Sequence, residues 1–327
     1  MTKPRISVVQ YLNTAPLVWG MLHGAQRGKF SLDFTTPARC ADAVAHGQAD
    51  VGIIPSIEVP RIEGAEIVPG ISIASKGLVK SVLLISKAPI EQIRSVAMDN
   101  SSRTSVALVT ILLRRFYGLD FQPEAADPRL DDMLKRADAA LLIGDPALAF
   151  ELSRGERCSA SQPRLAFEPR SACDPAVFEL NVESSRLRSK DSDTSFEPEL
   201  SSFGISCANL FVYDLAAEWR RFTALPFVFA VWAGRPEAGL ADFAADFQES
   251  RDQGLRHLDA IASEWGPRLE IAESAVKLYL AENINYDLDE ENLAGLRLFY
   301  NLAAEEGLIP AGRELRFALE LRDWVIG

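Results

Sequence analysis

Short apolar segments of strand length alternate with segments of helical spacing, and this alternation occurs twice along the chain of 327 residues. The segments expected to form strands are residues 6–12, 31–35, 50–54, 66–68, 71–74, 95–98 and 139–143. Helical spacing recurs at residues 16–22, 37–46, 103–117, 213–222 and 291–304. Strands that alternate with helices form mainly parallel sheets covered on both faces, so the sequence predicts an α/β fold.

Two longer apolar strands, residues 78–86 and 225–232, stand at the two ends of the second series. We expect each of them to cross between two lobes. This predicts a discontinuous first lobe, residues 1–79 with 233–327, and a second lobe of residues 80–232. A central cleft between the lobes is then expected, and small-molecule sites favour such positions.

Residues 152–210 fit neither series. They are rich in serine and poor in apolar residues, and they hold three of the four cysteines, Cys158, Cys173 and Cys207. A long stretch without periodicity is rare inside a compact domain. We interpret it as a disordered insertion in the second lobe, and a tolerated surface insertion is favoured over an interaction segment.

The charge of the chain limits its partners. Lys and Arg total 34 against 46 Asp and Glu, a net charge of −12, which argues against nucleic-acid binding. The apolar runs are too short to span a membrane, and the N-terminal segment lacks a signal-peptide pattern, so a cytoplasmic protein is expected. No Cys/His cluster, GxGxxG or Walker A motif occurs, so neither a metal nor a cofactor is expected. The oligomeric state is left open.

Polar residues at the predicted strand ends are the candidates for chemistry. Asn13 follows the first strand, either as a helix cap or as an amide donor that faces the crevice. Ser81 lies on the first crossing strand, where it is either structural or a contact to ligand from the cleft floor.

Two helix starts add further candidates. Ser102, Arg103, Thr104 and Ser105 precede or begin an apolar helix, and this density of donors favours carboxylate binding over simple capping. Gly144 and Asp145 follow a buried strand. Gly144 permits close approach of a ligand to the backbone, and Asp145 is expected to cap the next helix; a plain strand-to-helix turn is the alternative.

Seven ordered blocks carry a resemblance to a known family: YLNTAPL, ADVGIIPSIE, KSVLLISK, DNSSRTSVAL, AALLIGDPAL, YDLAAEW and LPFVFAVWA. They resemble the chorismate dehydratase family of the futalosine route to menaquinone. The resemblance implies a two-lobed, type 2 periplasmic-binding-protein-like fold. It also implies a hydro-lyase that converts chorismate to 3-[(1-carboxyvinyl)oxy]benzoate. The insertion at residues 152–210 is where the chain departs from the family.

The implied substrate carries two carboxylates. We expect one at the helix start from Ser102 to Ser105 and the other near Ser56 and Ser81. Arg103 either faces the ligand or pairs with Asp99. Asn13 and Ser81 are expected to orient the substrate and its departing hydroxyl. The candidate bases are Asp145, Asp99 and the substrate's own enolpyruvyl carboxylate, and we favour the third.

Three other functions remain open. The first is a solute-binding protein without catalysis, because a fold alone does not decide function. The second is the sister enzyme 1,4-dihydroxy-6-naphthoate synthase, whose family resembles this fold and looks to use a His where this chain has Gly144 and Asp145. The third is a homologue that the insertion has inactivated.

Overall fold

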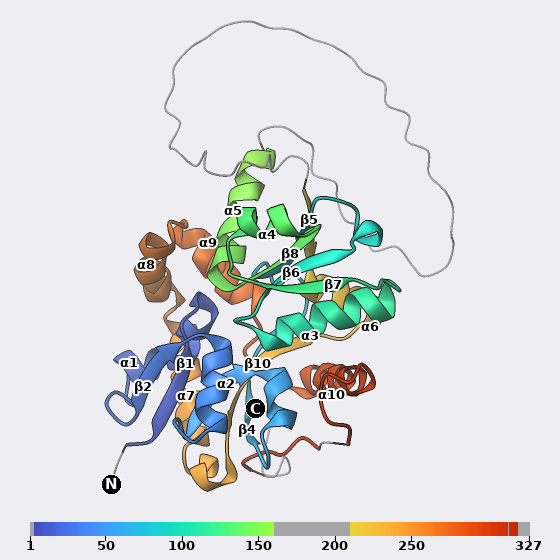
Figure 1. The fold of residues 1–327 in the computed structure, drawn as a ribbon. Coiled ribbons are helices and arrows are strands. Elements are labelled where there is room, and N and C mark those ends of the chain that lie inside the picture. The colour runs from blue at the N-terminus through green and yellow to red at the C-terminus, as the bar shows by residue number, and fades with distance from the viewer. Residues whose placement is uncertain (1–2, 160–209, 313, 320–327) are drawn as a thin grey trace, which may run out of the picture.

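Two five-stranded sheets, each flanked by helices, make up the molecule (Figure 1). The computed structural model describes residues 3–159, 210–312 and 314–319. Most of the insertion predicted at residues 152–210 therefore lies outside the described residues. The strand order is β2-β1-β3-β10-β4 in the first sheet and β7-β6-β8-β5-β9 in the second. The predicted α/β class is confirmed.

The first sheet consists of β1 (Arg5–Val9), β2 (Ser31–Thr35), β3 (Val51–Pro55), β4 (Glu66–Ser75) and β10 (Phe227–Gly234). The second consists of β5 (Val82–Ser86), β6 (Ser95–Asp99), β7 (Gln122–Ala126), β8 (Ala139–Ile143) and β9 (Phe211–Asp214). Strands β3, β5 and β8 are buried along their whole length, because helices cover both faces of the sheets.

The helices expected at residues 16–22, 37–46, 213–222 and 291–304 begin and end within two residues of those positions, and the one expected at residues 103–117 ends as an α-helix at Ile111. The described residues form ten α-helices. They are α1 (Ala15–His23), α2 (Pro37–Ala45), α3 (Arg103–Ile111), α4 (Leu130–Arg136), α5 (Gly144–Ser159), α6 (Leu215–Thr223), α7 (Ala244–Arg256), α8 (Leu258–Leu269), α9 (Glu273–Leu278) and α10 (Glu290–Glu305). Two π-helical segments, η4 (Leu112–Phe116) and η8 (Tyr279–Asn283), continue α3 and α9. Short 3₁₀ segments include η1 (Leu12–Thr14) and η2 (Ser56–Arg61). No described helix combines the length and apolar character that crossing a membrane requires.

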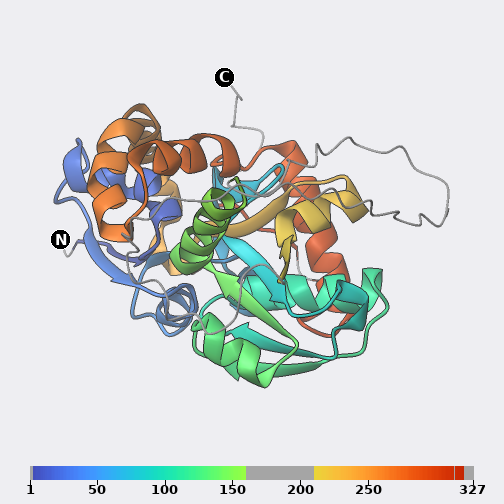
Figure 2. The same cartoon turned by 90° about the horizontal axis from the view of Figure 1, so that it is seen from above.

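The C-terminal helices return to the first sheet. From above, the orange helices α7 to α9 lie beside the blue N-terminal elements (Figure 2), and α1 packs against α7. Helix α10 packs against β10 and α3, so it contacts both halves of the molecule. The apolar stripe expected along it, Leu293, Leu296, Phe299, Tyr300 and Ala303, is buried.

The chain passes between the sheets twice, once from β4 to β5 and once from α6 to β10. The two arriving strands, β5 and β10, run antiparallel to both of their neighbours. The expectation of mainly parallel sheets is therefore wrong at these strands, because a strand that enters from the other sheet runs in the opposite direction. The predicted division at residue 232 falls inside β10, which pairs with β3 and β4 of the first sheet. We propose that the lobes follow the sheets, so that the second lobe ends before Phe227.

Candidate active site

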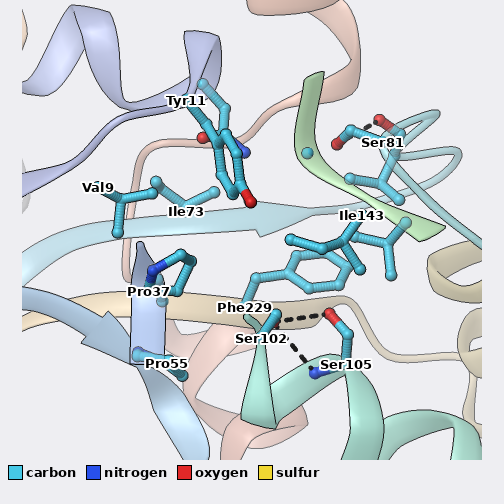
Figure 3. Close-up of a pocket in the computed structure, with 15 residues that line it drawn as sticks. Val9, Tyr11, Pro37, Pro55, Ile73, Ser81, Ser102, Ser105, Ile143 and Phe229 are labelled. Atoms are coloured by element: carbon cyan, nitrogen blue, oxygen red, sulfur yellow. Dashed lines mark hydrogen bonds between the residues drawn. The ribbon is translucent and has the colours of Figure 1, made fainter. Parts of the chain in front are cut away.

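A pocket of about 490 Å³, including its open mouth, lies between the two sheets. Elements of the first sheet contribute Val9, Tyr11, Asn13, Pro37, Pro55, Ile73, Phe229 and Ala230. The crossing at residues 76–81 and the second sheet contribute Val79, Ser81, Val82, Ser102, Ser105, Ile143 and Gly144. Figure 3 shows the Tyr11 ring, Ser81, Ser102 and Ser105 around a wall formed by apolar side chains.

The topology explains why these residues meet. Asn13 follows β1, and Pro55 ends β3, which runs parallel to β1 in the same sheet. Ser102 follows β6, and Gly144 follows β8, its parallel neighbour in the second sheet. The carboxyl ends of parallel strands lie at one edge of a sheet, where ligands of open α/β sheets bind. The pocket lies where these two edges face each other.

Five of the nine predicted site residues line this pocket: Asn13, Ser81, Ser102, Ser105 and Gly144. Ser102 is the N-cap of α3, and its Oγ accepts a 3.4 Å hydrogen bond from the Ser105 N–H. The two hydroxyls lie 3.0 Å apart. Capping and pocket lining therefore occur together at this helix start.

Ser56 and Thr104 are fully buried, but they do not line the pocket. The Ser56 hydroxyl donates to the carbonyl of Val228 over 2.8 Å. Thr104 Oγ1 accepts a 3.2 Å hydrogen bond from the Ile57 N–H. Both hydroxyls are thus engaged by the backbone, and the Thr104 bond joins the second sheet's helix α3 to η2 of the first.

Arg103 also lies outside the lining. Its guanidinium forms two hydrogen bonds to the Asp42 carboxylate, of 2.9 and 3.1 Å, and one of 3.2 Å to Glu58 Oε2. The alternative pairing with Asp99 is therefore wrong. Asp99 instead accepts the Ser101 N–H over 2.9 Å, and burial raises its pKa. Arg103 joins α3 to α2 and η2, so it spans the two sheets.

Asp145 does not cap its own helix as expected. It lies in the first turn of α5, and its Oδ1 accepts a 3.0 Å hydrogen bond from the Leu12 N–H of η1. Burial raises the pKa of this carboxyl to about 6, against the opposing effect of the Leu12 bond. Asp145 lies outside the lining of the pocket. Its hydrogen bond to Leu12 connects α5 of the second sheet to η1 of the first, close to Asn13.

Gly144 has a positive φ of 66°, which favours glycine. A Cβ at this position would lie 2.8 Å from ring carbons of Tyr11. The Gly144 N–H donates to the Ser81 carbonyl over 2.8 Å. Only glycine therefore allows α5 to begin between Ser81 and the Tyr11 ring without a shift of that ring.

Tyr279, which was not among the predicted site residues, contacts Ser81, one of the two candidate catalytic residues. Its phenol donates to Ser81 Oγ over 2.8 Å, although the two residues are 198 positions apart. Burial raises the pKa of this phenol, and the hydrogen bond to Ser81 opposes the effect. No local pattern marks Tyr279, because it lies in an ordinary helical stretch of the sequence.

The pocket combines an apolar wall with neutral donors. None of the described residues that line it carries a charge. Among the residues that the structure describes, no group of three His, Cys, Asp or Glu side chains is placed to hold a metal ion. An anionic ligand would therefore depend on hydroxyls, the Asn13 amide and the N–H groups in the first turn of α3.

Comparison with solved structures places this architecture in a known class. The protein AF1704 from Archaeoglobus fulgidus has a TM-score of 0.61 at 14% identity, covering 94% of this chain and 98% of that one. The periplasmic aliphatic sulphonate binding protein SsuA of Escherichia coli has a TM-score of 0.56 at 13% identity, covering 95% and 94%. The protein has the periplasmic-binding-protein-like fold, as the sequence analysis predicted.

Sequence comparison then gives the family. The model of the menaquinone biosynthesis family matches residues 4–159 and 206–305, so the chain belongs to that family. A chorismate dehydratase from Thermus thermophilus is 26% identical over 302 residues, which cover 90% of this chain and 93% of the relative. The predicted resemblance is confirmed.

Proposed function

We propose that this protein is a carbon–oxygen lyase that converts chorismate to 3-[(1-carboxyvinyl)oxy]benzoate and water. The observation that carries the proposal is that Asn13, Ser81, Ser102 and Ser105 line one pocket between the sheets. The family match and the relative that bears the name chorismate dehydratase support the same reaction.

Each part of the pocket suits one part of this substrate. The apolar wall of Ile73, Ile143 and Phe229 offers a surface for the ring. Ser102, Ser105 and the first-turn N–H groups of α3 offer donors for one carboxylate. Hydrogen bonds to such a charged group are each worth about 1.5–3 kcal/mol. Since the Ser56 hydroxyl is engaged by Val228, we assign the second carboxylate to the side of the pocket that holds Asn13.

The elimination removes a proton from a ring carbon and a hydroxyl from its neighbour. In our proposal the substrate's enolpyruvyl carboxylate takes the proton, the C–O bond breaks, and hydroxide and proton leave together as water. The ring becomes aromatic, which drives the reaction. Asn13 and Ser81 hold the substrate and donate to the departing hydroxyl. Positioning of this kind can lower a barrier by about 7–11 kcal/mol.

Asp145 is the alternative base, because its pKa of about 6 suits proton transfer. Its position outside the lining and its bond to Leu12 favour a structural role. We therefore expect Asp145→Asn to keep measurable turnover and Asn13→Ala to lose most of it, in steady-state assays with chorismate. Near-total loss in Asp145→Asn, with unchanged chorismate binding, would make Asp145 the base.

The direct test uses purified full-length protein with chorismate. We expect chorismate absorbance to fall and mass spectrometry to detect a product lighter by one water. Asn13→Ala, run in parallel, separates catalysis from spontaneous decay. Binding measured by calorimetry without consumption would overturn the proposed reaction in favour of a solute-binding protein, and absence of binding would overturn both.

A further inference from the structure

Tyr279 reaches the pocket wall from the C-terminal part of the chain. It begins η8, where the α9 helix widens into a π-helical turn, a feature frequent at functional sites. Its side chain is only 2% exposed, and the Ser81 partner is 1% exposed. A buried hydrogen bond of 2.8 Å thus joins a phenol of the first-sheet half to the hydroxyl on the first crossing.

The direction of this bond determines what Ser81 can do. The buried phenol stays protonated and donates, so it occupies an acceptor position of Ser81 Oγ. The other described partner of Ser81 Oγ is the Val79 carbonyl, at a long 3.4 Å. Ser81 donates its single proton to that carbonyl, and an oxygen atom of a bound substrate at a shorter distance would take the proton in place of this long bond. A hydroxyl that accepts one hydrogen bond becomes a stronger donor in the next.

We propose that Tyr279 is a positioning residue that fixes the Ser81 hydroxyl as a donor toward the departing hydroxyl of the substrate. The inference rests on the proposed function, and it names a residue that acts only through Ser81. The phenol does not line the pocket, so it does not contact the substrate in this arrangement.

A double-mutant cycle tests the proposal. Tyr279→Phe removes only the phenol oxygen, and we expect kcat to fall about three- to tenfold while KM changes by less than about twofold. Ser81→Ala should lose more. The double variant should be no slower than Ser81→Ala, because Tyr279 has nothing left to position. An additive loss in the double variant, or an unchanged kcat in Tyr279→Phe, overturns the proposal.

The matched control is Tyr300→Phe. Tyr300 is also a buried tyrosine, and its phenol donates to the Ser56 carbonyl over 2.6 Å. Its loss removes one buried hydrogen bond without touching Ser81, so kcat should stay unchanged. Thermal unfolding of every variant identifies any general loss of structure. If the wild-type protein does not consume chorismate, the proposed function fails; if it does and the cycle is additive, only the role of Tyr279 fails.

Discussion

At the scale of single residues, a substitution at Gly144 tests how closely the start of α5 must approach the Tyr11 ring. A Cβ at Gly144 would lie 2.8 Å from the ring, at a φ of 66°. We expect Gly144→Ala to lower the free energy of unfolding by about 1–3 kcal/mol. We also expect it to raise the KM for chorismate, because the ring must move within the pocket. Urea denaturation and steady-state kinetics measure the two effects.

Gly118 provides the control for backbone strain. It has nearly the same φ, 65°, but a Cβ there would have no atom within 4 Å. Gly118→Ala therefore carries the strain without the collision and should lose less stability, with no change in KM. Equal losses in the two variants would show that the Tyr11 contact contributes nothing.

Asp145 makes stability depend on pH. Its pKa is about 6, above the ordinary 3.8, so the folded protein binds more protons than the unfolded chain between these values. The contribution of Asp145 to stability is thus largest below about pH 4 and is lost as the pH rises through about 6. Because the carboxyl is partly exposed, we expect Asp145→Asn to gain about 1–2 kcal/mol relative to wild type across this window. Urea unfolding from pH 4 to 7 measures the difference, and a constant difference would contradict the assignment.

At the scale of elements, Asp214 connects helix α6 to the first crossing. Its Oδ1 accepts from the N–H groups of Ala216 and Ala217, both over 3.1 Å, and its Oδ2 accepts from the Lys80 N–H over 2.7 Å. Lys80 has a φ of 60°, a left-handed conformation that is unfavourable for lysine. The Asp214 carboxylate therefore caps one element and holds a strained residue next to Ser81.

We expect Asp214→Ala to lower the free energy of unfolding by about 2 kcal/mol, through the lost cap and the freed Lys80 N–H. It should also lower kcat, because Ser81 loses its fixed neighbour. Chemical denaturation and chorismate turnover are the measurements. Lys80→Gly is the companion variant, since glycine adopts this φ without strain; in the Asp214→Ala background it should restore part of the activity. If Asp214→Ala lowers stability without changing kcat, Asp214 acts only as the cap of α6 and does not position Ser81.

Elements with strong local signals could be predicted from the sequence, and those without them could not. The range predicted for β2 is correct, and α2 ends one residue earlier than expected, because apolar spacing and Pro37 mark them. The two strands predicted at residues 66–68 and 71–74 are one strand, β4, which continues through Pro69 and Gly70. Strand β7 is mostly exposed and contains Pro123, so no apolar alternation indicates it.

At the scale of the whole molecule, long-range contacts decide which candidate residues meet. Asn13, Ser102 and Gly144 could be proposed because parallel topology brings strand ends to one edge. Which hydroxyls face the pocket could not be predicted, since Thr104 and Ser105 are neighbours and only Ser105 lines it. The partner of Tyr279 depends on the return of the C-terminal helices, which no local pattern encodes.

A substitution at Arg103 tests whether ion pairs between the two halves, outside the pocket, contribute to ligand binding. Its guanidinium, on the second sheet's helix α3, pairs with Asp42 of α2 and Glu58 of η2, which belong to the first half. If the ion pairs of Arg103 with Asp42 and Glu58 are removed, we expect the two halves to separate more easily. Part of the free energy of ligand binding is then used to bring the halves together. We expect Arg103→Gln to raise the KM for chorismate about two- to fivefold, with kcat unchanged. The difference from wild type should shrink at high salt, because the pair is partly exposed.

Arg61→Gln is the matched control for this prediction. Arg61 also pairs with Glu58 and donates to the Leu308 carbonyl over 2.7 Å, but all three residues belong to the first half. Its loss removes an ion pair of Glu58 without weakening the contact between halves, so KM should not change. Steady-state kinetics at low and high salt compare the two variants. If Arg103→Gln lowers kcat instead, Arg103 acts on the substrate; if both variants raise KM equally, Glu58 matters for local structure and not for closure.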